Sequence, residues 1–270
     1  MVRLILLEWI KMRKRAAFWV PLGAFAVLLG LAEAPAYYRH LRQPGIHGGR
    51  MPGEWTTLLS NASFLALFVL LSATVILTGS ERGWRTQRQH VIDGLSRAEY
   101  LGAKTLGALM TTIAFWASVI VLGFGLVLLD ANLAADASAL IAEPLHFRMM
   151  AGLFLILVLI SSFGVMFGEI SGSAAAGIVV AIFFFLIQLP TVVMMSLSGG
   201  VGGALTPYLP ISAVLSLRDA AAYDPAAFAA SLERDPTQAL LPWTHAGALA
   251  LLYSAGALAA AWLSLRWRDL

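Results

Sequence analysis

The sequence predicts an all-α membrane protein with six transmembrane helices, and three observations carry this prediction. Of the 270 residues, 59% are hydrophobic and only 12% are charged, whereas about 25% are charged in a typical soluble domain. So few charges cannot cover the surface of a soluble globule of this size. The apolar residues gather in six runs, each near the roughly 20 residues that a helix needs to cross a bilayer. A cytosolic enzyme, a disordered chain and a free nucleic-acid-binding protein are therefore excluded.

The six runs are expected to form a single transmembrane domain over residues 1–270. The predicted spans cover residues 17–36, 58–79, 105–129, 149–169, 173–196 and 244–265. The turn between the fourth and fifth spans must be very short, and Gly172 can adopt the unusual backbone angles of such a turn. The chain has no cysteine, so it forms neither a disulfide nor a thiolate metal site.

The N-terminal segment, residues 1–16, has the pattern of an amphipathic helix. At about 100° per residue, its apolar face carries Val2, Ile5, Trp9 and Met12. Its polar face carries Arg3, Glu8, Lys11, Lys14 and Arg15. Such a helix lies in the membrane interface with its bases near anionic headgroups. A plain positively charged flank of the first span is the alternative.

The distribution of lysine and arginine predicts how the chain is oriented. Twelve of the eighteen bases fall in the N-terminal segment, the segment between spans two and three, and the C-terminal end. The richer side is expected to be cytoplasmic, which places both termini in the cytoplasm. The net charge of +3 is thus explained by topology and headgroup contact rather than by nucleic-acid binding.

The segment between spans two and three, residues 80–104, is the most informative part of the sequence. Glu81 stands at the end of span two and is followed at once by Arg82 and Gly83. A basic stretch with Arg85 and Arg88 comes next. Because the acid lies where the chain leaves the membrane, it needs a basic partner; the candidates are Arg82, Arg85 and Arg97.

A break at Asp93-Gly94 divides this segment into two helices. Ser96 is a suitable N-cap, and Glu99 three residues later completes a capping box. We therefore expect a short helix that ends before Asp93 and a new helix that begins at Ser96 and continues past Lys104 into span three.

This segment resembles the cytoplasmic loop of ABC-2-type transporter permeases. In that family, span two ends in an acid and a glycine, a short coupling helix follows, and a leu-ser-arg-x-glu-tyr segment and a lysine lead into span three. The matching positions here are Glu81, Gly83, residues 85–92, residues 95–100 and Lys104. Trp84 departs from the pattern, because a small residue is commoner there. In outline the resemblance covers the whole chain.

The resemblance implies a multi-pass permease subunit in a bacterial cell (inner) membrane. It implies two copies of a separate ABC ATPase subunit, which bind ATP and Mg, and a second permease copy or a related permease that completes a dimer. The residues that it assigns to ATPase coupling are Glu81, Arg82, Gly83, Arg85, Arg88, Arg97, Glu99, Tyr100 and Lys104. The expected activity is efflux of an amphiphilic or hydrophobic substrate such as a drug, an antimicrobial peptide or a lipid. A solvated basic loop with capping residues is the alternative for this segment.

The segment between spans five and six, residues 197–243, is expected on the outer side. Asp224-Pro225 predicts a helix over 225–234, with Asp as N-cap and Pro at the first helical position. Residues 207–222 are more apolar and predict a short helix dipping into the outer leaflet. By resemblance, short outer helices cap the exit of the transport path. A seventh span is the alternative, but every 20-residue window is interrupted by Pro207, Pro210, Arg218 and Asp219.

Few polar residues lie within the spans. Pro190 permits a kink in span five, and Gln188 needs an interhelical partner or water. Both are candidates for the translocation path or the dimer seam, and a satisfied interhelical hydrogen bond is the alternative. Glu33 and Glu169 lie near span ends, where we expect them to be solvated.

The chain carries no catalytic motif, so it is not expected to be an enzyme. The G-x-S-G of a six-span serine protease is absent, as are the metal-binding H-E-x-x-H and the phosphate-binding G-x-x-x-x-G-K-[ST]. No cofactor or metal is therefore expected on this chain, and ATP hydrolysis would belong to the partner. The alternative function is a permease-like scaffold that transmits force or a signal to a periplasmic partner without transporting.

Overall fold

The computed structural model describes residues 2–42, 52–83, 96–129, 144–198, 200–222, 228 and 240–267. Within these ranges the chain is helical apart from short turns, and no strand occurs. The predicted coupling helix in 85–92, the break at Asp93-Gly94 and the helix predicted over 225–234 lie outside the described residues.

Six long helices form the body of the molecule. They are α2 (Ala16–Arg42), α3 (Pro52–Gly83), α5 (Arg97–Leu129), α8 (Pro144–Ser171), α9 (Ala174–Ser198) and α13 (Trp243–Arg266). Each contains a stretch long and apolar enough to cross a membrane. They correspond one to one to the predicted spans and mostly extend a few residues beyond them. The prediction of an all-α, multi-pass membrane protein is confirmed.

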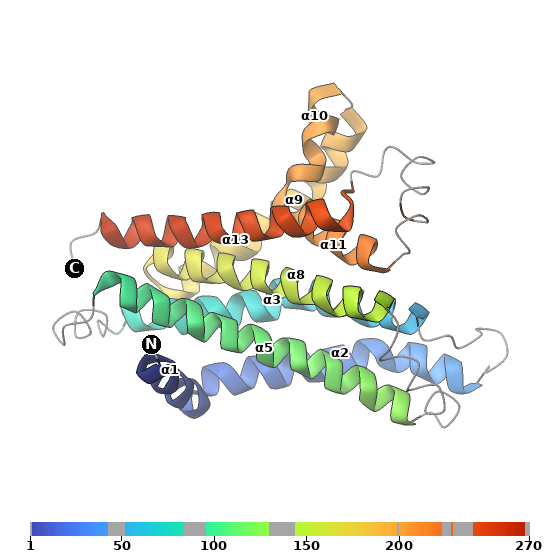
Figure 1. The fold of residues 1–270 in the computed structure, drawn as a ribbon, viewed down its shortest axis with the longest axis horizontal. Helices are drawn as coiled ribbons and strands as arrows, with labels where there is room; N and C mark the ends of the chain where they lie inside the picture. Colours follow the sequence, from blue (N-terminus) through green and yellow to red (C-terminus); the bar gives the residue numbers. More distant parts are fainter. Residues whose placement is uncertain are drawn as a thin grey trace.

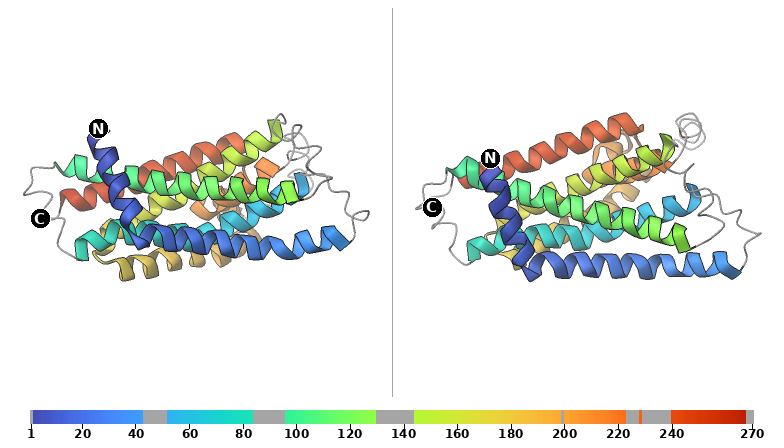
Figure 2. Two further views of the ribbon diagram at one scale, coloured as in Figure 1. Left: turned by 90° about the horizontal axis from the view of Figure 1, so that it is seen from below. Right: turned by 60° about the horizontal axis from the view of Figure 1, so that its bottom comes forward.

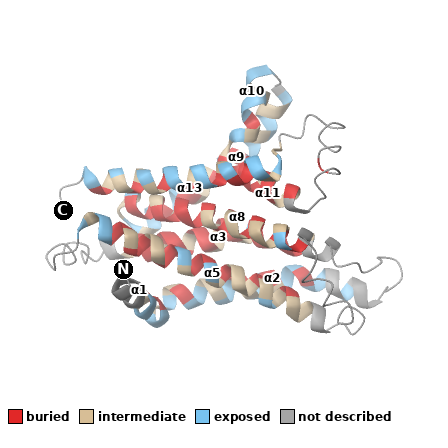
Figure 3. Ribbon diagram, viewed as in Figure 1, coloured by how far each residue is buried: buried red, intermediate tan, exposed pale blue. Residues whose placement is uncertain are grey.

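Helices α3 and α8 form the centre of the bundle. Two thirds of each span (67%) is buried in the protein, against 17% to 28% for the other four. The remaining long helices pack around this pair, and the buried residues concentrate on it (Figures 1 and 3). Most residues of the other four spans are therefore at least partly exposed.

The contact between α3 and α8 depends on glycines in α8. A Cβ at Gly164 would overlap the Thr74 hydroxyl oxygen and lie 2.7 Å from the Thr74 Cβ. Gly168 stands in the same relation to Thr78, whose Cβ would be 3.0 Å away. Small residues four apart let two membrane helices approach closely. We call these two glycines and two threonines the glycine seam.

A two-residue turn joins α8 to α9. Gly172 in this turn has φ 74°, a conformation that favours glycine over residues with a Cβ. The Ser173 hydroxyl accepts a hydrogen bond from the Ala176 N–H at 3.2 Å, which caps the start of α9. The predicted short turn at Gly172 is confirmed.

Helix α9 leaves the bundle partway along its length. Its second half and α10 (Gly200–Leu205) project from the side of the bundle (Figure 1). The chain then passes through a 3-10 turn, η1 (Thr206–Tyr208), and returns as α11 (Pro210–Ala222), whose apolar side chains are buried against the bundle. The two arms, Gly200–Tyr208 and Pro210–Ala220, are bent by 68°. The short helix predicted over 207–222 is present but begins three residues later, at Pro210.

Helix α1 (Val2–Lys14) crosses one end of the bundle at a steep angle to α2 and packs on α5 (Figure 2). Met12, which was predicted on the apolar face toward the membrane interface, is buried at this contact instead, whereas Trp9 of the same face is 44% exposed. Glu8, predicted on the polar face, is also buried. That prediction is wrong because Glu8 lies one turn from Met12 and therefore faces the same helix.

Candidate functional site

The start of α5 is fixed by a capping box. The Glu99 Oε2 accepts hydrogen bonds from the Ser96 N–H at 2.9 Å and the Ser96 hydroxyl at 2.7 Å. The Ser96 Oγ in turn accepts one from the Glu99 N–H at 3.2 Å. These bonds satisfy backbone donors that have no partner within a helix. The helix start predicted at Ser96 is confirmed.

Arg97 ties this helix start to the end of α13. Its Nη1 donates a hydrogen bond to the carbonyl of Arg266 at 2.8 Å. A cation near the last carbonyls of a helix is favourable, because those groups carry partial negative charge. Arg97 was one of three expected partners of Glu81, but the side chain of Glu81 lies outside the described residues.

One turn into α5, Tyr100 contacts two buried charged side chains. Its hydroxyl donates a hydrogen bond to the Glu169 Oε1 of α8 at 3.3 Å. The Lys104 Nζ lies 5.5 Å from the centre of the Tyr100 ring, within the range of a cation–π contact. All three side chains are buried. Buried charges are costly unless they are paired, so this cluster holds α5 against α8.

The burial of Glu169 contradicts the expectation that it is solvated. Its side chain is only 1% exposed, although it lies at the end of a span. The first turns of α5 pack over the end of α8 and cover it. Its position near the end of α8 is as predicted, but the neighbour that covers it comes from a distant part of the sequence.

The remaining residues assigned to ATPase coupling are less fully described. Glu81, Arg82 and Gly83 belong to the last turn of α3, and nothing is described of their side chains. Arg85 and Arg88 lie outside the described residues. The structure thus brings together the second half of the set, at the start of α5.

Gln188 joins α9 to α11. Its Nε2 donates to the Phe184 carbonyl at 3.1 Å, and its Oε1 accepts from the Ile211 N–H at 3.0 Å. The interhelical hydrogen bond, left open as the alternative from sequence, is thus present. Pro190 is exposed, and α9 continues through it. No described residue of α9 beyond Gln188 is buried, so this amide marks where α9 leaves the bundle.

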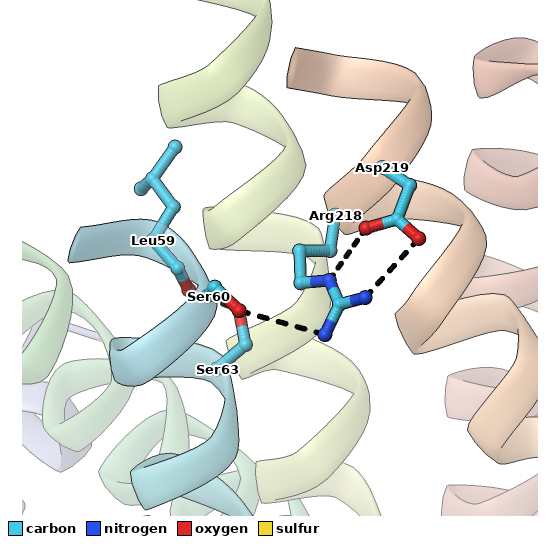
Figure 4. Close-up of polar contacts among 5 residues, drawn as sticks. All are labelled: Leu59, Ser60, Ser63, Arg218 and Asp219. Carbon is cyan, nitrogen blue, oxygen red and sulfur yellow. Dashed lines mark hydrogen bonds and ion pairs between the residues drawn. The ribbon is translucent and has the colours of Figure 1, made fainter. Parts of the chain in front are cut away.

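A second polar cluster lies at the opposite end of the bundle and was missed from sequence. Arg218 of α11 binds its neighbour Asp219 through two nitrogens, at 2.6 and 3.1 Å, and its Nη1 reaches the Ser60 Oγ of α3 at 3.5 Å (Figure 4). The two adjacent, oppositely charged residues within an otherwise apolar stretch could have indicated this cluster.

Glu33 of α2 is buried near the same end. It is 5% exposed and accepts a hydrogen bond from the Asn61 Nδ2 at 2.7 Å. The expectation that Glu33 is solvated is wrong, because α3 supplies Asn61 as a partner beside it.

The fold and these contacts define a multi-pass membrane protein with a braced polar cluster at one end. Among the described residues, no group of three or more histidine, aspartate or glutamate side chains is placed to hold a metal ion. Comparison with protein-family models gives no match, and neither does comparison with curated protein sequences.

Proposed function

We propose that this chain is the permease subunit of an ABC-2-type, ATP-driven transporter in a bacterial cell membrane, with both termini cytoplasmic. The observation that supports this most is the bracing of the start of α5. The residues that resemble the family motif are tied to α8 through Glu169 and to α13 through the carbonyl of Arg266.

This bracing suits a helix that receives force. The capping box keeps the first turn of α5 from fraying, and the two ties join that turn to two further spans. A push on the chain before Ser96 would therefore move α5, α8 and α13 together. The coupling residues that precede it, Glu81 to Arg88, would make the contact with the ATPase.

The other subunits follow from the same proposal. Two copies of a separate ATPase would bind ATP and Mg, and a second permease would complete the path. Helix α9 has the least buried span, 17%, which suits a seam with that second copy near Gln188 and Pro190. The apolar spans favour export of an amphiphilic or hydrophobic substrate: a drug, an antimicrobial peptide or a lipid.

The two peripheral helical regions also fit this arrangement. The crossing of α1 over the end of the bundle (Figure 2), with Trp9 and Ile10 exposed, suits a helix lying in the cytoplasmic interface. The bent pair of α10 and α11 suits a re-entrant element at the outer face, which would cap the exit.

The test is to purify the chain from native membranes with its bound proteins. We expect an ATPase subunit to co-purify and its substrate-stimulated activity to fall when Arg97→Ala removes the tie to α13. Arg266→Ala is the matched control, because it deletes an arginine at the same place but keeps the carbonyl that Arg97 binds.

Two results would contradict this proposal. One is purification of an intact complex without any ATPase. The other is an Arg97→Ala complex whose ATPase activity equals that of Arg266→Ala. Either would favour the alternative, a scaffold that transmits force or a signal to a periplasmic partner.

A further inference from the structure

A small pocket lies between α1, α3 and α5, at the end of the bundle that α1 crosses. Glu8 and Lys11 line it from α1, and Gly107 lines it from α5. Its free volume for the centre of a water molecule is about 10 Å³, which is close to the smallest space that holds one water. The size of the pocket therefore admits a single water molecule and excludes an organic ligand or a phosphate.

The carboxylate of Glu8 has one oxygen with a partner and one without. The residue is only 8% exposed, because it lies on the face of α1 that packs on α5. Its Oε1 accepts a hydrogen bond from the Lys11 Nζ at 3.0 Å. In the described part of the chain, no group donates a hydrogen bond to the other oxygen, Oε2. Burying a carboxylate oxygen without a hydrogen-bond donor is costly, so Oε2 needs a donor.

The position of Gly107 shows that Oε2 faces the pocket. A Cβ at Gly107 would lie 3.7 Å from the Glu8 Oε2 and 3.7 Å from the Met12 Sδ, and all three residues line the pocket. Because Gly107 has no side chain, the space beside Oε2 stays open. Separations of this size are ordinary van der Waals contacts, so one methyl group would fit into this space while α1 and α5 keep their places.

We propose that this pocket holds one ordered water, which donates a hydrogen bond to the Glu8 Oε2 and accepts one from the Lys11 ammonium. A lysine has three N–H donors, and the Glu8 Oε1 takes one of them. A buried water makes about two to four hydrogen bonds, so these two partners are enough to hold it. The water completes the hydrogen bonding of Glu8, which allows the charged pair to be buried between α1 and α5. This site does not depend on transport.

The direct test is a density map of the full chain, purified in detergent, at a resolution that shows ordered waters. No partner subunit is needed, so failure of the transporter proposal cannot affect the result. We expect a peak within hydrogen-bond distance of the Glu8 Oε2. The peak should be missing in Gly107→Ala, because the added methyl group takes the place of the water.

Thermal unfolding gives an independent readout, because filling a wet pocket and filling a dry pocket change the Tm in opposite directions. Gly102→Ala on α5 is the control, since nothing lies within 4 Å of its Cβ position. The better helix propensity of alanine should raise its Tm by about 2 °C. Gly107→Ala should instead lower the Tm by about 2 °C, because displacing the water leaves Oε2 without a donor.

Glu8→Leu supplies the background that isolates the water. Without the carboxylate, no group in the pocket needs a donor, so Gly107→Ala in this background should raise the Tm as Gly102→Ala does. Glu8→Leu alone and the double variant lack the same ion pair, so its loss cancels when the two are compared. Helical circular dichroism checks that each variant is folded.

The proposal is overturned if Gly107→Ala raises the Tm equally in the parent and in Glu8→Leu, because the pocket is then dry. It is also overturned if the map of the parent protein shows no peak beside the Glu8 Oε2, a result that needs no variant. A peak that persists unchanged in Gly107→Ala would place the water outside this pocket and would overturn the proposal as well.

Discussion

Helices α8 and α9 are neighbours in the chain and nearly equal in mean hydropathy, yet they occupy opposite environments. In α8 67% of the span is buried, and in α9 17%. The apolar character of a helix therefore indicates that it spans the membrane, but it does not indicate whether the helix is buried in the protein or faces outward. Helix α8 meets α3 along the glycine seam through Gly164 and Gly168, whereas α9 exposes large side chains such as Phe183 and Val193.

The strongest way to break this comparison is to truncate one phenylalanine in each helix. Phe163 of α8 is buried, with its ring centre 5.3 Å from that of Phe184 and 5.5 Å from that of Phe185. Phe163→Ala should lower the free energy of unfolding by about 3 kcal/mol, because it leaves a cavity among these rings. Phe183→Ala on α9, where the side chain is 58% exposed, should change it by less than about 0.5 kcal/mol.

Both variants would be measured by denaturant unfolding in the same detergent. Equal losses for Phe163→Ala and Phe183→Ala would mean that α9 is as tightly packed as α8, and the comparison would fail.

The glycine seam gives the next largest effect. Gly164→Ala places a methyl group where the Thr74 side chain now lies, so the two helices must move apart. We expect a loss of about 2 kcal/mol from overpacking. Gly125→Ala on α5 is the matched control, because nothing lies within 4 Å of its Cβ position. There the better helix propensity of alanine should leave the protein unchanged or slightly more stable. If the Gly164 variant behaves as the Gly125 variant does, close approach at the seam is not needed.

The smallest effect is expected at the junction of α9 with the bundle. Gln188→Leu removes the acceptor of the Ile211 N–H and should cost about 1 kcal/mol. The rate of hydrogen exchange at the Ile211 amide should rise in the same variant. Thr191→Val serves as the control, since that hydroxyl donates to Ile187 within α9 itself. Unchanged exchange at Ile211 in the Gln188 variant would show that other contacts hold α11 in place.

Local features were predictable from the sequence, and contacts between distant segments were not. The six spans follow from apolar length, and the capping box from two residues three positions apart. The tie from Arg97 to Arg266 joins residues 169 positions apart, and no pattern near either residue indicates the other. Glu33 and Glu169 were misjudged for the same reason: position along a span gives the depth of a residue but not the helix that covers it. The glycine seam could have been predicted from the sequence, because the spacing of Gly164 and Gly168 is typical of close helix packing.

The two-residue turn between α8 and α9 also constrains how the protein enters the membrane during synthesis. A turn of this length, with Gly172 at positive φ, is too short to connect one helix already in the membrane to the other still outside it. The two helices must therefore pass from the insertion machinery into lipid together, as a preformed hairpin. The turn carries no lysine or arginine, so the hairpin has no orienting charge at its tip and takes its direction from the spans inserted before it.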